Sequence, residues 1–413
     1  MSLTIVENFI SRFPAKKMFF LFICLSYLFI TIGINENRHK AFDIAAAMAI
    51  FCLISEKADF KKIIKESYWF IILLIYILFN PSYLLNNGSF GLGDATFVLR
   101  AFGSFCLGLC AQLYMPKLWK FCVLLLPVSV AILFVKALVF GYGPSDAIGS
   151  RLFLNMTQAP NLLAFVTVSG IIYLICLRYN VIEAIKQKFY AHLFFLTLYG
   201  LLFSVLLLTQ ARASLLGLFG CFVYWLVCYK RKILSVFAIT LLIMGVGYVS
   251  MPNNFERFKD FTITNITENT NQFLSSRLTI WEISLKIVKN NLVFGVTDSK
   301  KAYSDFISDK EKMKQLTYKI YIDNNLDNNF TNNTPHNIFI AMLFYYGLIG
   351  LLLFLAMAFQ SIRAAVLSDN KLFISIFIFF GLTGLTDYFF EVIHGVVIYF
   401  FTFGVMIADK SQG

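Results

Sequence analysis

Two arginines of this chain occupy positions that suit an anion better than they suit the chain itself. Arg212 lies in Leu208–Ser214, where one apolar run ends and the next begins, and Arg277 opens a helical stretch after Ser275-Ser276. A helix N-terminus carries roughly half a positive charge and free N–H groups, so an arginine there is unfavourable for the helix alone. A phosphate at the same place would satisfy both. We therefore predict one polyanion between two arginine-bearing helix starts; the alternative is a pair of solvated arginines near lipid phosphates.

His336 is the candidate base. It lies in Thr334-Pro335-His336-Asn337, at the start of a further apolar run. Thr334 is a suitable N-cap and Pro335 suits the first helical position, which would place His336 in the first turn. Because the helix dipole and a nearby cationic site both disfavour the protonated ring, we expect a neutral imidazole there that can accept a proton. The alternative is an interfacial or capping histidine.

The composition requires a membrane. The chain has 413 residues, of which 59% are hydrophobic and 14% are charged, with a mean hydropathy of +0.73. Soluble domains carry about 45–50% apolar and about 25% charged residues. These figures exclude an ordinary cytosolic enzyme, a disordered chain and a disulfide scaffold. The net charge of +12 would suggest a nucleic-acid partner in a soluble protein, but here we attribute it to basic cytoplasmic loops and expect no nucleic acid.

The apolar runs are continuous, which indicates helices and not a barrel of alternating strands. We expect about twelve transmembrane helices, at residues 18–34, 41–54, 67–83, 97–115, 118–140, 161–177, 191–209, 213–228, 233–249, 337–359, 372–386 and 395–408.

The basic residues indicate the orientation. With the N-terminus inside, the inner segments hold eighteen Lys and Arg residues and the short outer loops hold four. This bias predicts that both termini are cytoplasmic. The fold class is therefore an all-α polytopic membrane protein.

A single long hydrophilic segment, 250–335, divides the chain into three parts. Residues 1–249 form predicted helices 1–9, residues 250–335 form a largely helical periplasmic loop domain, and residues 336–413 form helices 10–12. Within the loop, Leu278, Trp281, Leu285 and Val288 recur at helical spacing, which predicts one apolar face over Ser275–Asn291. An Asn- and Asp-rich tract follows at Asp323–Asn333.

Further basic residues lie on or near the outer face. Arg100 and Lys136 fall inside apolar runs and Arg151 in an outer loop. A charge at membrane depth is usually paired or functional, although a long side chain can also reach the headgroups. We treat all three as candidate substrate-binding residues.

Two other outer histidines, His39 and His394, are rival bases, and Asp387 and Glu391 lie near the second. The eight cysteines fall within or at the ends of apolar runs, and no Cys-x-x-Cys or His-x-x-x-His pair occurs. We expect no metal site and no cofactor.

The three motifs resemble a family signature. Leu208–Leu215 around Arg212, then Ser276-Arg277-Leu278 with Trp281 and Gly295, then His336-Asn337, are similar in order, spacing and topology to the O-antigen ligase and O-antigen polymerase superfamily. The length resembles that of the lipopolysaccharide O-antigen ligases in particular.

The resemblance implies a membrane-embedded glycosyltransferase of the GT-C type in the bacterial inner membrane, with its active site facing the periplasm. The donor would be O-antigen on undecaprenyl pyrophosphate and the acceptor a sugar hydroxyl of the lipid A core. Arg212 and Arg277 match the arginines that hold the pyrophosphate, and His336 matches the general base. Some relatives carry a second His beside this one, where this chain has Pro335 and Asn337. Arg151 and Asn161 loosely resemble a further polar segment of the family.

The chemistry suits these residues without a metal. A pyrophosphate leaving group needs fixed cations, a sugar hydroxyl gains from a positioned base, and direct attack inverts the anomeric centre. Retention normally needs a carboxylate nucleophile beside a second acid, and Asp387 with Glu391 does not convincingly supply that pair. Two alternatives stay open, an O-antigen polymerase with a lipid-linked glycan acceptor, and a transporter of lipid-linked sugars. Transporters usually bind near the midplane between repeats, and neither feature occurs here.

Overall fold

The computed structural model describes most of the chain. The described residues are 13–34, 38–55, 59–81, 92–140, 147–148, 151–152, 160–182, 188–250, 277–296, 298–317, 335–387, 390 and 393–412.

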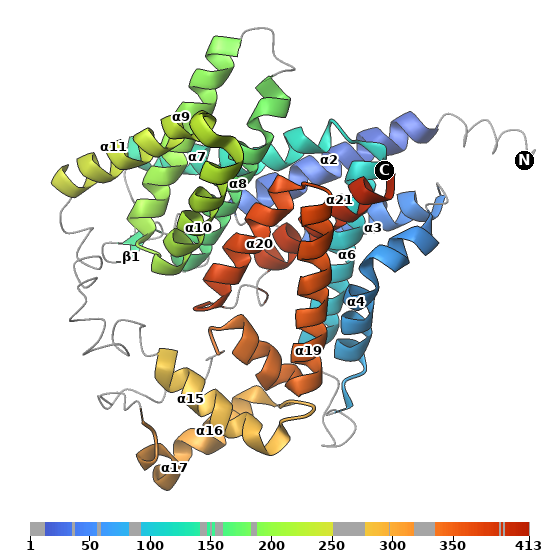
Figure 1. Ribbon diagram of the computed structural model, residues 1–413, viewed down its shortest axis with the longest axis vertical. Coiled ribbons are helices and arrows are strands. Elements are labelled where there is room, and N and C mark those ends of the chain that lie inside the picture. Colours follow the sequence, from blue (N-terminus) through green and yellow to red (C-terminus); the bar gives the residue numbers. More distant parts are fainter. Residues whose placement is uncertain are drawn as a thin grey trace, which may run out of the picture.

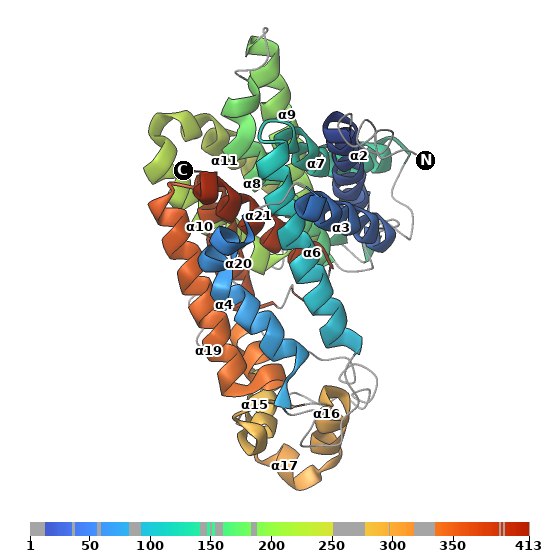
Figure 2. The ribbon, with the colours of Figure 1, turned by 90° about the vertical axis from the view of Figure 1, so that its right-hand side faces the viewer.

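Long helices dominate the described residues, packed side by side with a cluster of shorter helices at one end (Figures 1 and 2). The long helices are α2 (Phe13–Ile34), α3 (Arg38–Ser55), α4 (Phe60–Leu78), α6 (Leu92–Tyr114), α7 (Trp119–Phe140), α8 (Pro160–Ile182), α9 (Lys188–Thr209), α10 (Arg212–Tyr229), α11 (Leu234–Ser250), α19 (Ile338–Leu367), α20 (Lys371–Gly384) and α21 (Ile393–Gln412). Each coincides with one of the apolar segments predicted from the sequence.

The shorter elements connect these helices or lie beyond their ends. They are the antiparallel pair β1 (Ala147–Ile148) and β2 (Arg151–Leu152), the 3-10 helix η1 (Lys230–Ile233), α15 (Arg277–Val288), η3 (Lys289–Asn291), α16 (Ser299–Ser308) and α17 (Lys310–Lys314).

The helices confirm an all-α, multi-pass membrane protein. Within the described residues, seven helices are long and apolar enough to cross a bilayer, and α2, α11 and α20 contain shorter apolar stretches. Helices α3 and α4 carry several charged residues near their N-terminal ends. Twelve spans and cytoplasmic termini stay predictions.

The centre of the bundle is formed by α8 and α21, in each of which 89% of the residues of the apolar stretch are buried. Both are apolar on all faces, as a helix surrounded by other helices must be. One hydrogen bond joins them, since the hydroxyl groups of Tyr173 of α8 and Thr402 of α21 lie 2.9 Å apart.

The described part of the long loop, from Arg277 to Thr317, has its own small core. Ile280, Ile283 and Val288 of α15 pack with Tyr303 and with Phe344 of α19. The apolar face predicted from the sequence was therefore right for Val288, which is 2% exposed, and wrong for Leu285, which is 45% exposed. The face that packs against α19 also carries Ile280 and Ile283. The Asp323–Asn333 tract and residues 251–276 lie outside the described residues.

Two glycines join this loop to the bundle. Gly347 interrupts α19 with a φ of +68°, and Gly295 faces it with a φ of +82°. A Cβ atom on Gly295 would lie 2.6 Å from the Gly347 nitrogen, and one on Gly347 would lie 2.2 Å from the Val293 carbonyl oxygen. Glycine is required at both positions, for its left-handed conformation and for the close approach of two backbones.

The docked backbones satisfy each other's hydrogen bonds. Because Gly347 interrupts α19, the Phe344 carbonyl and the Leu348 N–H lack their usual partners within the helix. The backbone of the loop supplies partners for both groups. The Val296 N–H donates to the Phe344 carbonyl at 2.7 Å, and the Leu348 N–H donates to the Leu292 carbonyl at 2.8 Å. Helix α4 adds a bond from the Tyr76 hydroxyl to the Tyr346 carbonyl at 2.8 Å. The start of α15, and with it Arg277, is therefore held relative to α19 by main-chain contacts.

We predict that Gly295→Ala releases the loop, because the new methyl group overlaps the α19 backbone. The expected loss is about 2 kcal/mol or more in the stability of the docked loop. Limited proteolysis of the purified protein in detergent should cleave the variant faster between residues 277 and 317. Gly381→Ala is the matched control, since a Cβ atom there meets nothing within 4 Å. Equal cleavage of the two variants would contradict the docking role.

Candidate active site

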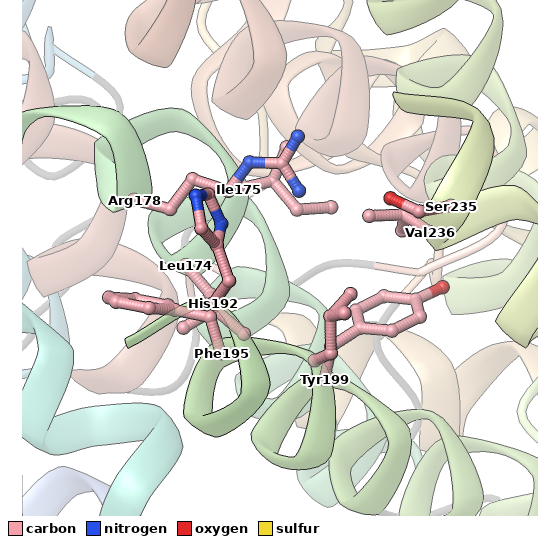
Figure 3. Close-up of a pocket in the computed structure, with 9 residues that line it drawn as sticks. Leu174, Ile175, Arg178, His192, Phe195, Tyr199, Ser235 and Val236 are labelled. Atoms are coloured by element: carbon pink, nitrogen blue, oxygen red, sulfur yellow. The ribbon is translucent and has the colours of Figure 1, made fainter. Parts of the chain in front are cut away.

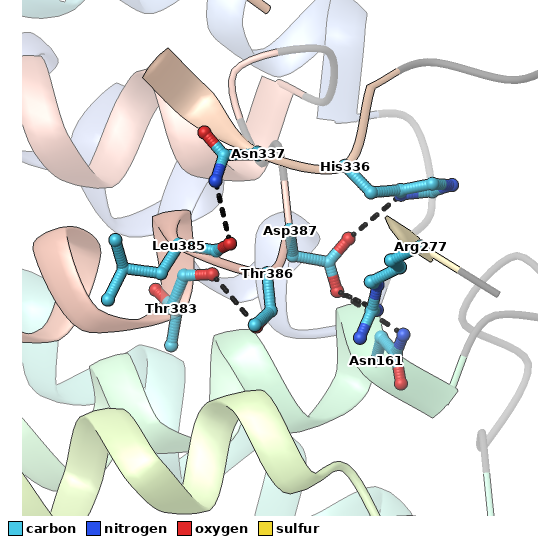
Figure 4. A network of polar contacts seen from close by, with 8 residues as sticks. All are labelled: Asn161, Arg277, His336, Asn337, Thr383, Leu385, Thr386 and Asp387. Atoms are coloured by element: carbon cyan, nitrogen blue, oxygen red, sulfur yellow. Dashed lines mark hydrogen bonds and ion pairs between the residues drawn. The ribbon is translucent and has the colours of Figure 1, made fainter. Parts of the chain in front are cut away.

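Asp387 joins three segments that lie far apart in the sequence (Figure 4). Its Oδ2 lies 3.4 Å from an Nη atom of Arg277 and accepts a hydrogen bond from the Asn161 side-chain amide at 3.3 Å. Its Oδ1 lies 3.2 Å from Nδ1 of His336. The carboxylate thus brings together a cation from α15, an amide from α8 and the imidazole that precedes α19.

The end of α20 places this carboxylate. The helix ends at Gly384, and the N–H groups of Thr386 and Asp387 both donate to the Thr383 carbonyl, at 3.0 and 2.9 Å. This turn holds the Asp387 backbone, and the side chain is 11% exposed. A carboxylate this buried needs partners, and Arg277, His336 and Asn161 supply them.

The structure corrects the expected start of α19. The N-cap is Asn337 and not Thr334, which lies outside the described residues, and Pro335 is not the first helical residue. Asn is at least as good a cap as Thr, and its Oδ1 accepts from the N–H groups of Phe339 and Ile340 at 2.9 and 3.0 Å.

His336 therefore precedes the helix and is not in its first turn. Its φ of +46° lies in the left-handed region, where the backbone of a residue other than glycine is strained. This conformation directs the ring toward Asp387 (Figure 4) while 36% of the side chain stays exposed.

Asn337 also joins the two helices that carry the His336–Asp387 pair. Its side-chain amide donates to the Leu385 carbonyl at 2.8 Å, two residues before Asp387. One side chain thus caps α19 and bonds the residues that follow α20, which fixes the distance between imidazole and carboxylate.

The packing of α10 against α20 places Arg212 at the same end of the bundle. The Trp225 indole N–H donates to the Ser375 hydroxyl at 2.8 Å. Further toward the start of α10, a Cβ atom on Gly217 would lie 2.7 Å from the Thr383 side chain. The two helices are therefore antiparallel, and the register brings Arg212, the first residue of α10, alongside the end of α20 that leads to Asp387.

The start of α10 has the properties of an anion site. Its N-cap is Ala211, which makes no side-chain capping bond. The chain turns into it through Gln210, which has a φ of +52° and is buried. The first N–H groups of α10 and the half-buried Arg212 therefore present positive charge in one place.

The His336–Asp387 contact selects one tautomer. An ionised carboxylate can only accept hydrogen bonds, so Nδ1 of His336 carries the proton and donates it to Asp387. Nε2 then keeps its lone pair and can take a proton from a bound hydroxyl group. His336 can thus activate a hydroxyl group, and the positive charges of Arg212 and Arg277 can stabilise an anionic leaving group such as a phosphate.

Of the remaining candidates, Asn161 joins the network and Arg100 and Lys136 do not take part in it. An Nη atom of Arg100 lies 3.1 Å from Nδ1 of His39 on the neighbouring helix α3. Lys136 lies on the exposed side of α7. Arg151 begins strand β2, and its side chain lies outside the described residues.

The rival histidines are placed unfavourably for base catalysis. Nδ1 of His39 faces the permanent charge of Arg100, so it accepts a bond from that group. His394 is fully buried in α21, where a sugar hydroxyl has no access. Glu391 lies outside the described residues.

Sequence reasoning missed the part of Asp387. We noted it as a neighbour of His394, whereas it contacts His336, 51 residues away, and Arg277, 110 residues away. The available signal was an acidic residue at the outer end of a predicted span, where a base and a cation had already been expected.

Comparison with known proteins supports the resemblance. A family model described as O-antigen ligase matches residues 195–355, which include Arg212, Arg277, Gly295 and His336. The match ends before Asp387 and begins after Asn161. No curated protein matches the chain.

These findings confirm the predicted resemblance to the O-antigen ligase family over residues 195–355. The apolar helices indicate a multi-pass membrane protein. Members of the O-antigen ligase family are glycosyltransferase-like enzymes.

We predict that Asn337→Ala lowers the free energy of unfolding by about 1 kcal/mol for the lost cap, with a further loss for the Leu385 carbonyl. Asn337→Asp keeps the capping oxygen and loses the bond to Leu385, so its thermal midpoint in detergent should lie between those of wild type and Asn337→Ala. Asn370→Ala is the control, since Asn370 caps α20 in the same manner at the other end. A midpoint of Asn337→Asp equal to that of the wild type would contradict the interhelical bond, and identical midpoints for the two Asn337 variants would contradict the cap.

Proposed function

We propose that this protein is an O-antigen ligase of the bacterial inner membrane. It transfers O-antigen polysaccharide from undecaprenyl pyrophosphate to a sugar hydroxyl of the lipid A core at the periplasmic face. The observation that carries the proposal is the shared carboxylate of Asp387, which holds His336 and Arg277 within one site. Both residues lie in the segment that matches the O-antigen ligase family.

The reaction divides into two tasks. His336 takes the proton of the acceptor hydroxyl at Nε2 while the hydroxyl oxygen forms a bond to the anomeric carbon of the donor. The bond between that carbon and the pyrophosphate oxygen breaks, and undecaprenyl pyrophosphate leaves. Arg212, Arg277 and the N–H groups at the start of α10 stabilise the charge that develops on the leaving group.

The role of Asp387 favours inversion at the anomeric carbon. A retaining enzyme needs a carboxylate that is available to attack the sugar. Asp387 is engaged by Asn161, Arg277 and His336, which suits orientation of the base and stabilisation of the imidazolium that forms. Direct attack by the acceptor is the reaction that these residues support.

The position of the site favours surface chemistry over transport. The network is formed by residues at the starts of α8 and α15, by the residue before the N-cap of α19 and by the turn after α20 (Figure 4). All of these lie at the ends of helices. A transporter would place its polar groups near the midplane. A polymerase would use the same donor grip, so the acceptor must be tested directly. Arg100, Lys136 and Arg151 stay candidates for binding acidic groups of the substrates.

Reconstitution tests the function. We expect proteoliposomes of the full chain, supplied with undecaprenyl-pyrophosphate-linked O-antigen, to produce glycan-bearing lipid A core, detected as a mobility shift on a gel. His336→Ala, Arg212→Ala and Arg277→Ala, confirmed to insert and fold, should each leave no product visible on the gel. Growth of a second lipid-linked glycan instead would establish a polymerase. Sugar lipid crossing the bilayer without product would establish a transporter, and a fully active His336→Ala would remove the base.

We predict that Asp387→Asn acts through His336. The amide keeps the shape but removes the charge that orients and stabilises the ring, so kcat should fall on the order of 10²-fold while KM changes little. The double variant with His336→Ala should be no slower than His336→Ala alone, because the two residues act as a unit. Additive losses would show that Asp387 works independently, and a raised KM at constant kcat would make it a binding residue.

A further inference from the structure

The hydroxyl group of Ser214, the third residue of α10, is buried without a bonding partner. Ser214 is 1% exposed, and its Oγ atom has no hydrogen-bond partner within the described part of the chain. A buried polar atom in this condition costs folding free energy, and native structures bond nearly all such atoms. The hydroxyl therefore needs an acceptor that the described residues do not supply.

The other buried hydroxyl groups of the described residues show what Ser214 lacks. Even Tyr199, which lines the cavity between α8, α9 and α11 (Figure 3), is bonded through its hydroxyl to Thr240. Most buried serines and threonines donate to the carbonyl group three or four positions earlier in their helix. These are Thr31, Ser67, Ser104, Ser129, Thr167, Ser169, Thr209, Thr240, Ser284, Ser361, Ser375, Thr383 and Thr402.

The turn before α10 removes the usual acceptor. The carbonyl group four positions before Ser214 belongs to Gln210, whose φ of +52° places it outside the helix. The carbonyl group three positions before belongs to the N-cap, Ala211, and accepts the Leu215 N–H at 3.2 Å. A left-handed Gln210 is strained, so the fold as a whole maintains the conformation that leaves this hydroxyl unbonded.

Ser214 lies on the face of α10 that meets α20. Gly217, one turn later on the same buried face, is so close to α20 that a Cβ atom there would lie 2.7 Å from the Thr383 side chain. Because the two helices are antiparallel, one turn back to Ser214 corresponds to one turn forward from Thr383, toward Asp387. The Cα–Cβ bonds of a helix tilt toward its N-terminus, so the hydroxyl is directed toward the start of α10.

A phosphate group suits the donors at this helix start. The first N–H groups of α10 and the Ser214 hydroxyl can all donate, and phosphate oxygens only accept. Arg212 and Ser214 are two positions apart, so their side chains leave the helix on different sides. A phosphate placed on the helix axis is within reach of both. A hydrogen bond from a hydroxyl to an anionic oxygen is short and strong.

We propose that Ser214 is a further substrate-binding residue, whose hydroxyl donates to a phosphate oxygen of undecaprenyl pyrophosphate. This inference rests on the proposed function, in which Arg212 binds the same pyrophosphate. The Oγ atom is enclosed in the ligand-free protein, so binding includes a local displacement of the atoms that cover it. The unbonded hydroxyl destabilises the empty site, and the ligand removes that cost when it binds.

The test measures stability and affinity separately, on the full-length protein in detergent. Ser214→Ala removes an unbonded hydroxyl, so the thermal midpoint of the ligand-free variant should be at least as high as that of the wild type. The same variant should bind undecaprenyl pyrophosphate about tenfold more weakly in a titration, as the loss of a hydrogen bond to a charged group predicts. A residue with a purely structural role would not combine the two results.

Ser361→Ala is the matched control. Ser361 is also buried in a helix, near the other end of α19 from His336, and its hydroxyl donates to the Met357 carbonyl at 2.7 Å. This variant should bind undecaprenyl pyrophosphate as tightly as the wild type does. An equal loss of affinity in Ser361→Ala would show that the effect is not specific to Ser214 and would overturn the proposal.

The remaining outcomes separate this inference from the proposed function. Unchanged affinity in Ser214→Ala, or a lower midpoint of its ligand-free form, would overturn the role of Ser214 and leave the ligase in place. Weaker binding by Ser214→Ala, in a protein that transfers no glycan when reconstituted, would support Ser214 and remove the ligase. A wild type that does not bind undecaprenyl pyrophosphate would overturn both.

Discussion

The contact between two backbones at Gly295 and Gly347 determines where the candidate active site can form. Both residues at this crossing are glycines, so the two backbones come closer together than any residue with a Cβ atom would permit. The α19 helix gives up its own hydrogen bonds at this point and receives replacements from the loop. The hydrogen bonds join the loop segment around Gly295 to α19, so each segment supports the conformation of the other. Arg277 lies at the start of that loop segment.

The electrostatics of the candidate site follow from one buried carboxylate. Asp387 compensates the positive charge of Arg277. It also fixes the ring of His336. A single negative charge thus allows two cations and a neutral base to share a partly buried region, and the remaining positive charge is available to an anionic ligand.

The helices were predictable because each is a long apolar run, and a continuous apolar run can satisfy its backbone hydrogen bonds within a membrane only as a helix. Arg277 and His336 were predictable as neighbours because their positions at helix starts were electrostatically unusual. Asp387 was not, since its partners are distant in the sequence and nothing local marks a turn that points a carboxylate toward them. The buried face of α15 was predicted correctly at Val288 and wrongly at Leu285, for a related reason. The leucines follow a helical period, but the residues that α19 covers depend on tertiary packing, which selected Ile280 and Ile283.

The carboxylate of Asp387 has α8 and the turn after α20 on one side and the loop that bears Arg277 on another, while the ring of His336 remains partly uncovered. Helices α15, α16 and α17 lie beyond the end of the long helices in both views (Figures 1 and 2). In the proposed reaction, the lipid-linked donor reaches this site with its apolar anchor still in the bilayer. A molecule of that kind meets the protein by two-dimensional diffusion, so its encounter rate depends on its surface density and not on its concentration in solution.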